Sequence, residues 1–400
     1  MTRDLLPWPR LVNLLRRGGF DAVVVSSPEN VTYVSEYWGL SHWARRGTQV
    51  YAVAWNEPTR SVDIVLPATT ADLVTDEVFS RSRPHVYGTF PVREGSVPLT
   101  AEESRLVRVA NASGEEGGPL GALASVLSAR AAGGARIAVE RGGIDPGVLS
   151  GLREKLDRLS FASAEQMLAE LRSVKSDREV AALRQAARIT ERAIDEALAS
   201  ARPGKSERDV AGAFQHSLVS QGALPQTTVI GAGRRSALPH GQPTSRPITV
   251  GDILRLDVGC RYRHYVSDIA RTAAVGHRTR TQAAVYAALW EGVEAAARAL
   301  RPGTTGADVF RAAMSAVRGA GIYDYQRGHC GHGIGIANYD LPRITADSTD
   351  MIEAGMVVCL ETPFYQIGEF GLQVEDTFVV TASGADRVTN APGELRALEI

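Results

Sequence analysis

The stretch that decides the fold reads ILRLDVGCRYRHYVSDIARTAAV and covers residues 253–275. Two runs rich in apolar and aromatic residues flank a polar segment at Cys260 to His264, a pattern typical of two strands joined by a turn. The first run carries Asp257 and the second carries Asp268. Because neighbouring strands hold their side chains side by side, we expect the two carboxylates to lie close together on one sheet.

A second pair of runs repeats this arrangement with glutamates. MVVCLETPF (356–364) contains Glu361, and LQVEDTFVVT (372–381) contains Glu375. A carboxylate inside an apolar strand is costly to bury unless a compensating charge is present. Between the two pairs, the segment RGHCGHGIGIA carries His332, and its glycines allow the backbone to pass close to a pocket or to neighbouring strands.

Taken together, these positions form an oxygen-rich donor set with one imidazole: Asp257, Asp268, His332, Glu361 and Glu375. Such a set suits two divalent metal ions, with Mn²⁺ the first choice and Co²⁺, Zn²⁺ or Fe²⁺ also compatible. The set predicts a two-metal hydrolase. Each residue alone has a simpler interpretation, since a single Asp is typical of turns and Glu375 could keep an edge strand soluble.

Length and composition are those of an ordinary globular protein. The chain has 400 residues, of which 44% are hydrophobic and 22% charged, and its formal net charge is -1. This length exceeds the usual size of one hydrophobic core, so at least two domains are expected. The balanced charge gives no electrostatic reason to expect nucleic acid or an anionic membrane as a partner.

The cysteines and the first residues predict a cytoplasmic protein. Only Cys260, Cys330 and Cys359 occur, an odd and sparse set that favours reduced thiols over a disulfide framework. The start, MTRDLLPWPRLVNLLRRGG, interrupts any apolar signal core with charges and prolines, and no later run stays apolar for about 18 residues.

The chain reads as two α/β halves joined by a helical connection. Strong helix formers fill 164–201, where Ser176 can cap a new helix with Glu179 three positions later. The polar segment 93–118 is interpreted as a surface excursion. Strand-like runs in the first half predict a mixed or parallel sheet covered by helices: FDAVVVSS (20–27), QVYAVAW (49–55), SVDIVLP (61–67) and RIAVE (136–140). We place the domain boundary between residues 165 and 166.

The second half shows signs of an internal repeat. Helical segments 204–223 and 304–321 each start at an Arg-Pro-Gly turn, and each follows a longer helical stretch, 178–201 or 280–300. Both are followed by strand-rich sequence. The pattern predicts a duplication with pseudo-two-fold symmetry, and chance similarity of two short segments is the alternative.

The motif order LDVG, SDIART, GHGIG, ETP and VEDT resembles the pita-bread metallopeptidases, the group of methionine aminopeptidase, prolidase, aminopeptidase P and creatinase. The resemblance covers roughly residues 175–385. The preceding half is similar in size and layout to the amino-terminal domain of the creatinase, prolidase and aminopeptidase P branch. The resemblance implies an α/β amino-terminal domain (1–165), an α+β pita-bread catalytic domain (166–400) with the internal duplication, and a homodimer.

It also implies metal-binding roles that match this sequence position by position. Asp257 resembles the bidentate ligand of one ion, Asp268 and Glu375 the bridging carboxylates, and His332 and Glu361 the ligands that complete the other site. Glu361 would also take a proton from the attacking water and return it to the leaving nitrogen.

Three further residues receive roles from the same resemblance. His240, in GRRSALPHGQPT, resembles the histidine that contacts substrate and steadies the reaction intermediate, and its alternative is an ordinary loop histidine. Arg271, in DIART, matches a basic position that orients a carboxylate beside the metal ligands. Tyr339 stands where the peptidases usually have a second histidine, seven residues after His332, and its hydroxyl can still donate a hydrogen bond to substrate.

Two more positions differ from or add to the family pattern. His329, three residues before His332, either contacts substrate in place of the missing histidine or packs against its strand, and packing is favoured. Gln373 stands where the family often has Arg. In the loop 37–47, Arg45 or Arg46 could capture a substrate carboxylate, although a packed turn with solvated charges is favoured.

Three functions remain open at this point. We favour an Xaa-Pro dipeptidase or aminopeptidase P-like peptidase that acts on short peptides. The alternative is a metal-dependent amide hydrolase of a small specialised metabolite, the substrate class of creatinase. A non-catalytic binding module is disfavoured because the ligand set is complete. Metal content, followed by hydrolysis of dipeptide and small-amide panels, separates the three.

Overall fold

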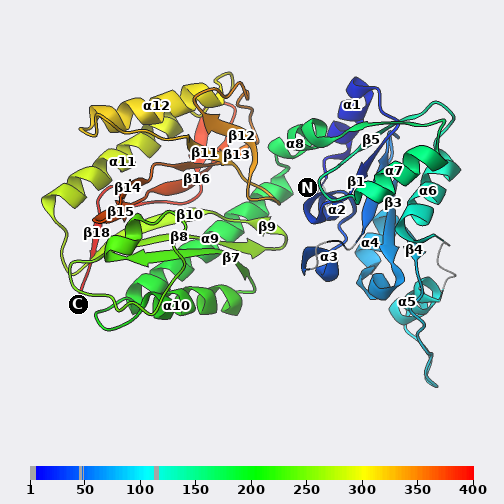
Figure 1. The fold of residues 1–400 in the computed structure, drawn as a ribbon, viewed down its shortest axis with the longest axis horizontal. Coiled ribbons are helices and arrows are strands. Elements are labelled where there is room, and N and C mark those ends of the chain that lie inside the picture. Colours follow the sequence, from blue (N-terminus) through cyan, green and yellow to red (C-terminus); the bar gives the residue numbers. More distant parts are fainter. Residues whose placement is uncertain (1–5, 45–46, 48, 112–116) are drawn as a thin grey trace. The chain divides into compact units, whose positions relative to one another are not determined.

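The computed structural model describes residues 6–44, 47, 49–111 and 117–400 (Figure 1). The chain divides into two compact units, one of which ends at Leu171 while the other begins at Arg172. Arg45 and Arg46 lie outside the described residues.

The amino-terminal unit is built on a mixed sheet with strand order β4-β3-β2-β1-β5-β6. The four predicted strands are present as β1 (Ala22–Val25), β2 (Tyr51–Trp55), β3 (Val62–Pro67) and β5 (Arg136–Val139). The two edge strands, β4 (Arg83–Tyr87) and β6 (Ser160–Ser163), were not predicted. Their side chains are mostly half-buried or exposed, so their sequences lack the apolar run that marks an inner strand.

Helices cover this sheet, and α6 and α7 form a core with β1, β2 and β5. The described residues of the segment 93–118 are mostly exposed, as expected of a surface excursion, but residues 101–110 form the helix α5, which was not predicted. Thr100 and Glu103 start it with a reciprocal capping box, a signal that was present in the sequence. The helices are α1 (Trp8–Gly18), α2 (Pro28–Ser35), α3 (Leu40–Ala44), η1 (Ala68–Leu73), α4 (Asp76–Arg81), α5 (Ala101–Ala110), α6 (Gly118–Arg130) and α7 (Pro146–Lys155), followed by α8 (Glu165–Ser173), which crosses the boundary.

The carboxy-terminal unit contains a long curled sheet with strand order β12-β11-β13-β16-β10-β8-β7. Three short strands pair off this path, β9 with β8, β17 with β16 and β18 with β10, and β14 pairs with β15 in a separate small ladder. The strands are β7 (Leu224–Ala232), β8 (Ile253–Tyr262), β9 (Tyr265–Val266), β10 (Ile269–Val275), β11 (His329–Gly333), β12 (Asp340–Thr345), β13 (Val357–Glu361), β14 (Phe364–Gln366), β15 (Phe370–Leu372), β16 (Glu375–Val380), β17 (Ala385–Arg387) and β18 (Arg396–Leu398).

The predicted duplication is visible in this unit (Figure 1). Helices α9 (Asp177–Ser200) and α10 (Glu207–Ser220) pack on β7, β8 and β10, whereas α11 (Arg280–Ala299) and α12 (Gly306–Gly319) pack on β11, β13 and β16. The short 3-10 helix η2 (Gly233–Ala237) follows β7. Both α10 and α12 begin with a capping box, and the glycine of each preceding Arg-Pro-Gly turn has φ of 89°.

The predicted hairpin within 253–275 turns at Arg263 and His264, between β8 and β9. Both residues have positive φ, 46° and 76°, as a tight turn that matches the twist of its strands requires. After this turn the chain returns as β10, antiparallel to β8, with Ala270 opposite Asp257. Asp268 stands one residue before β10 begins.

Candidate active site

A row of carboxylates crosses the centre of the curled sheet. Asp257 on β8 is paired with Ala270 on β10, Ala270 with Glu375 on β16, and Glu375 with Glu361 on β13. Side chains that stand directly opposite on neighbouring strands point to the same face. The three acidic side chains, which are far apart in the sequence, are therefore brought onto one face by strand register.

Asp268 and His332 reach the same face from neighbouring positions. Asp268 precedes Ala270 by two residues, and His332 is paired with Cys359, two residues before Glu361. Gly331 makes this pairing possible, because its φ is 145° and an added Cβ would lie 2.1 Å from the carbonyl oxygen of Cys359. The strand β11 therefore approaches β13 closely enough to present His332 to the carboxylates.

All five predicted metal ligands line one cavity of about 190 Å³, together with the predicted substrate contacts His240, His329 and Tyr339. Candidate ligand atoms of Asp268, His332 and Glu375 all lie within 4.8 Å of one another. The remaining walls are formed by Pro239, Arg327, Tyr365 and Gln373. A larger cavity, of about 440 Å³, lies beside α9 and contains none of the predicted metal ligands.

Burial and mutual repulsion make these carboxylates hard to ionise. Burial raises the pKa of Asp257, and burial together with neighbouring carboxylates raises the pKa of Asp268 and of Glu375 well above the ordinary values. Burial, with the nearby charge of Asp257, raises the pKa of Glu361 to about 7. Four acidic groups in one small cavity can be ionised together only if positive charge lies close to them.

The donor atoms are arranged to receive cations. Asp268 Oδ1 is buried without a hydrogen-bond partner, and Asp268 Oδ2 lies 3.9 Å from His332 Nε2. Burial lowers the pKa of His332 to about 4, so its ring is neutral at pH 7. Its Nδ1 lies 3.0 Å from the carbonyl oxygen of Gly333, which fixes the proton there and leaves the Nε2 lone pair facing the cavity. These residues fit divalent metal ions.

Glu361 has two polar neighbours inside the cavity. His329 Nδ1 lies 3.1 Å from Glu361 Oε1, and Gln373 Nε2 donates to Glu361 Oε2 at 3.1 Å. The expectation that His329 merely packs against its strand is therefore wrong. The half-buried ring faces the site, and burial lowers its pKa, so it is largely neutral at pH 7.

Arg255, which was not among the predicted site residues, is fully buried beside the cavity. Its Nη1 donates to Gln373 Oε1 at 2.7 Å and lies 3.4 Å from Asp257 Oδ2. A guanidinium thus stands beside Gln373, although position 373 itself carries no charge. A signal for it existed, because Arg255 interrupts the apolar run two residues before Asp257 and so shares its face of the strand.

Arg255 also holds the loop that carries His240. Its Nη2 donates to the carbonyl oxygens of Leu238 and Pro239, at 2.6 and 3.0 Å. One side chain therefore connects the His240 loop to Gln373 and, through Gln373, to Glu361.

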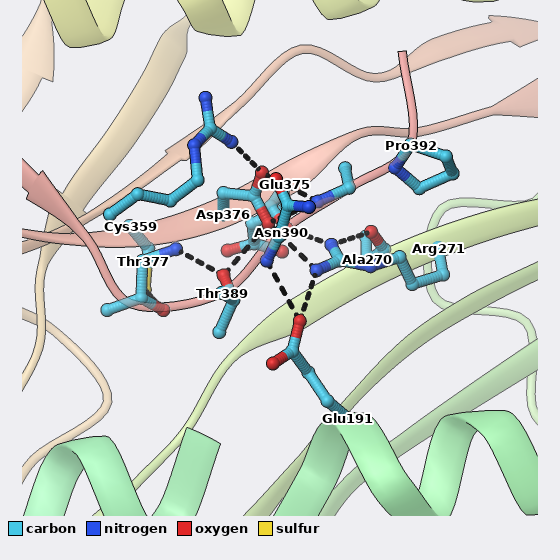
Figure 2. Close-up of polar contacts among 12 residues, drawn as sticks. Glu191, Ala270, Arg271, Cys359, Glu375, Asp376, Thr377, Thr389, Asn390 and Pro392 are labelled. Carbon is cyan, nitrogen blue, oxygen red and sulfur yellow. Dashed lines mark hydrogen bonds and ion pairs between the residues drawn. The ribbon is translucent and has the colours of Figure 1, made fainter. Parts of the chain in front are cut away.

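Figure 2 shows the polar network behind Glu375. Arg271 donates to the backbone carbonyl of Glu375 at 2.6 Å, to Asp376 Oδ1 at 2.8 Å and to Glu191 Oε1 at 3.0 Å. The fully buried Asp376 also accepts hydrogen bonds from Arg387, Thr389 and the amide of Ala391. Arg271 thus holds the backbone of the strand that presents Glu375, and it does not touch the Glu375 carboxylate.

Tyr339 lies at the mouth of the cavity and is 66% exposed. Its ring centroid lies 4.1 Å from that of His332. Partial burial and the cavity carboxylates raise the pKa of Tyr339 to about 12, so the hydroxyl keeps its proton at neutral pH. The next residue, Asp340, turns away and pairs with Arg172 at 2.9 Å and Lys175 at 3.3 Å.

Comparison with known proteins places this site in a family. Residues 181–382 match the model of metallopeptidase family M24. The chain belongs to this family. An Xaa-Pro dipeptidase of Pyrococcus furiosus is 31% identical over 250 residues, which are 62% of this chain and 72% of the relative.

Solved structures extend the similarity of fold to nearly the whole chain. The crystal structure of dipeptidase PepE from Mycobacterium ulcerans is 26% identical, with a TM-score of 0.79 and coverage of 98% of this chain and 96% of that one. The prolidase from Pyrococcus furiosus is 24% identical and superposes with a TM-score of 0.75 over 95% and 99% of the two chains. The α/β domain followed by a duplicated pita-bread domain is confirmed, and the M24 protein is a metal-dependent peptidase.

Proposed function

We propose that Asp257, Asp268, His332, Glu361 and Glu375 bind two divalent ions, Mn²⁺ first among them, and that the enzyme hydrolyses Xaa-Pro bonds in short peptides. The observation that carries this proposal is the convergence of four ionisation-resistant carboxylates and one neutral imidazole on a single cavity. Arg327 in the cavity lining and Arg255 beside Asp257 supply two positive charges against four carboxylates, so bound cations are expected to supply the remaining counter-charge.

The chemistry of such ions is well defined. Bound divalent ions polarise a carbonyl and lower the pKa of water towards neutrality. Glu361, whose Oε1 lies 3.1 Å from His329 Nδ1 inside the cavity, is placed to accept a proton from the attacking water and to return it to the leaving nitrogen. His240 and the protonated hydroxyl of Tyr339 line the same cavity and can donate hydrogen bonds to the substrate carbonyl. His329 supports Glu361 and can contact substrate from the same side.

The substrate class follows from the size of the cavity and from the relatives. A volume of about 190 Å³ is small beside the several hundred Å³ of sites for drug-sized ligands, which favours a dipeptide or the first residues of a short peptide. The Pyrococcus furiosus relative is named an Xaa-Pro dipeptidase. These observations favour a peptidase over the small-amide hydrolase and over the binding module.

The test is hydrolysis of defined substrates by metal-loaded protein. We expect Mn²⁺-loaded protein to cleave Xaa-Pro dipeptides, to lose this activity on chelation and to regain it when Mn²⁺ is restored. A panel of small amides without a peptide bond should be cleaved far more slowly. Preferential cleavage of that panel would overturn the substrate class, and hydrolysis unaffected by complete metal removal would overturn the metal assignment.

We also propose that the enzyme works as a homodimer in the cytoplasm and binds neither nucleic acid nor membranes. Cys260, Cys330 and Cys359 are buried free thiols, which suits a reducing compartment. In the described part of the chain, no helix is long and apolar enough to cross a membrane. Sedimentation of the purified protein tests the dimer, since a mass of one chain at micromolar concentration would contradict it.

A further inference from the structure

A second cavity, of about 440 Å³, lies in the carboxy-terminal unit between α9, β10 and the segment that leads into β18. Its volume is within the range of sites that bind small molecules. It shares no lining residue with the proposed metal cavity. Figure 2 shows part of its wall, where Glu191 from α9 meets Arg271 from β10. The cavity is therefore separate from the metal site and large enough for a ligand of its own.

Arginine dominates the charge of this cavity. Its charged lining residues are two carboxylates and four arginines: Glu191, Asp195, Arg188, Arg192, Arg271 and Arg396. Arg271 is matched by Glu191 at 3.0 Å and by the buried Asp376 at 2.8 Å. Arg396 Nη1 lies 3.5 Å from Asp195 Oδ1. The other two arginines leave the cavity with an excess of positive charge.

Arg188 and Arg192 carry this excess. They stand one turn apart on α9, where side chains four residues apart lie on the same face and like charges repel. Among the described residues, no carboxylate lies within ion-pair distance of either guanidinium, and their one hydrogen bond joins Arg188 to Gln185. Arg184, one turn earlier, differs because it lies 4.0 Å from Asp386. An anion between Arg188 and Arg192 would offset their repulsion.

Part of the lining is apolar. Ile194 and Leu198, on the inner side of the same helix, are 3% and 5% exposed, and Pro392 adds apolar surface from the segment before β18. Apolar surface beside guanidinium groups favours a ligand with an apolar body and a charged end. A guanidinium binds the oxygens of carboxylate, phosphate and sulfonate groups through charge-assisted hydrogen bonds, which are stronger than those between neutral groups.

We propose that this cavity binds a small organic anion, with its charged oxygens between Arg188 and Arg192 and its apolar body against Ile194 and Leu198. The ligand class is a compact apolar molecule that carries a carboxylate, phosphate or sulfonate group. This site goes beyond the proposed function, because it takes no part in the hydrolysis. Arg271 forms its inner wall and also donates to the backbone carbonyl of Glu375 at 2.6 Å. The bound anion would thus lie one side chain away from the strand that carries a proposed metal ligand.

Ligand-observed NMR titration tests this site with three probes. Benzenesulfonate has both the charge and the apolar body, methanesulfonate lacks the apolar body, and methyl phenyl sulfone lacks the charge. We expect a Kd of about 1 mM or lower for benzenesulfonate, and affinities at least about tenfold weaker for the other two probes. Mn²⁺-loaded and chelated protein should bind benzenesulfonate with Kd values within about threefold of each other, because the probe does not bind the metal centre.

Variants of the two arginines locate the bound probe. Both side chains are exposed, so their replacement should leave the fold intact. The double variant Arg188→Gln/Arg192→Gln should bind benzenesulfonate at least about tenfold more weakly, and Arg188→Lys/Arg192→Lys should retain part of the affinity. Arg298→Gln, which removes an exposed arginine on α11, is the matched control and should bind benzenesulfonate as the unmodified protein does.

Three results would overturn the anion site: no binding of benzenesulfonate below about 10 mM, binding that requires Mn²⁺, or unchanged binding by Arg188→Gln/Arg192→Gln. Equal affinity for methyl phenyl sulfone would also overturn it, since the arginines would then contribute nothing. Equal affinity for methanesulfonate would contradict the apolar part of the ligand class. The titration needs neither substrate nor turnover, so its outcome is independent of whether the enzyme cleaves Xaa-Pro peptides.

Discussion

Glu361 contacts His329 and Gln373, which hold its carboxylate in one orientation inside the cavity. Glu361→Gln keeps the shape of the side chain but removes the group that exchanges a proton. We expect kcat to fall by roughly 10²- to 10⁴-fold, the usual range for loss of a general acid and base. Steady-state kinetics on an Xaa-Pro dipeptide, with metal content measured in parallel, provide the check. Glu291→Gln, on the exposed side of α11, should behave as unmodified enzyme. A kcat of the Glu361→Gln variant within tenfold of that of the unmodified enzyme would show that Glu361 is not the general acid and base.

Tyr339 stands where related peptidases usually have histidine, so the question is whether its phenol hydroxyl can donate the hydrogen bond to substrate in place of the imidazole. Its pKa of about 12 keeps the hydroxyl protonated at neutral pH, so it can donate a hydrogen bond but cannot shuttle protons readily. Tyr339→Phe should lower kcat by about tenfold and change KM by less than about twofold if the hydroxyl acts mainly on the transition state. The exposed Tyr323 offers a matched Tyr→Phe control, expected to be silent. An unaltered kcat would show that Tyr339 lines the cavity without taking part in the reaction.

Strands and helices were predictable where their sequences carry a strong local signal. The apolar runs of β1, β2, β3, β5, β8 and β13 and the helix-forming segments of α9 to α12 appear close to the expected positions. The edge strands β4 and β6 were missed because their half-exposed residues do not alternate clearly. The helix α5 was missed because the capping pair Thr100 and Glu103 was overlooked within a polar segment.

At the site, residue types were predictable but long-range contacts were not. Strand signals and the family resemblance identified which acidic residues and which histidines to consider. Sequence could not show that Arg255 fills the space beside Gln373, because that contact spans 118 positions and depends on strand register. For the same reason it could not show that His329 turns towards Glu361.

The approach of β11 to β13 gives a prediction at the scale of these elements. Gly331→Ala would place a methyl group 2.1 Å from the Cys359 carbonyl oxygen and strain the backbone at φ of 145°. We expect a loss of about 3 kcal/mol or more in the free energy of unfolding, measured with denaturant, and loss of activity as His332 is displaced. Gly319→Ala in α12 meets no atom within 4 Å and should change stability by less than about 1 kcal/mol. Equal stability of the two variants would show that the close approach is unimportant.

The acidic cavity should make the stability of the whole molecule depend on pH when metal is absent. The pKa of Glu361 is about 7 in the folded protein against an ordinary value of 4.5. Its contribution to the free energy of unfolding is therefore lost as pH rises through about 7. His329 and His332 have pKa values below 6.5 in the folded protein, so their opposing contributions change only below about pH 6.5. Between about pH 6.5 and 8, the melting temperature of chelated protein should therefore fall.

Metal binding should remove this fall, because cations stabilise the ionised carboxylates. At a Mn²⁺ concentration of about 100 times Kd, we expect the melting temperature to rise by roughly 5 °C or more, with a larger increase at pH 8 than at pH 6.5. Thermal unfolding at several pH values, with chelator and with Mn²⁺, measures both effects. A metal-independent melting temperature at pH 8 would contradict the proposed neutralisation of the cavity.

Anomalous diffraction from crystals of Mn²⁺-loaded protein, combined with elemental analysis of the same material, tests the proposed metal centre most directly. We predict two manganese peaks in the cavity, in contact with Asp257, Asp268, His332, Glu361 and Glu375, and about two ions per chain. An empty cavity in fully loaded protein, or manganese bound only at other residues, would contradict it.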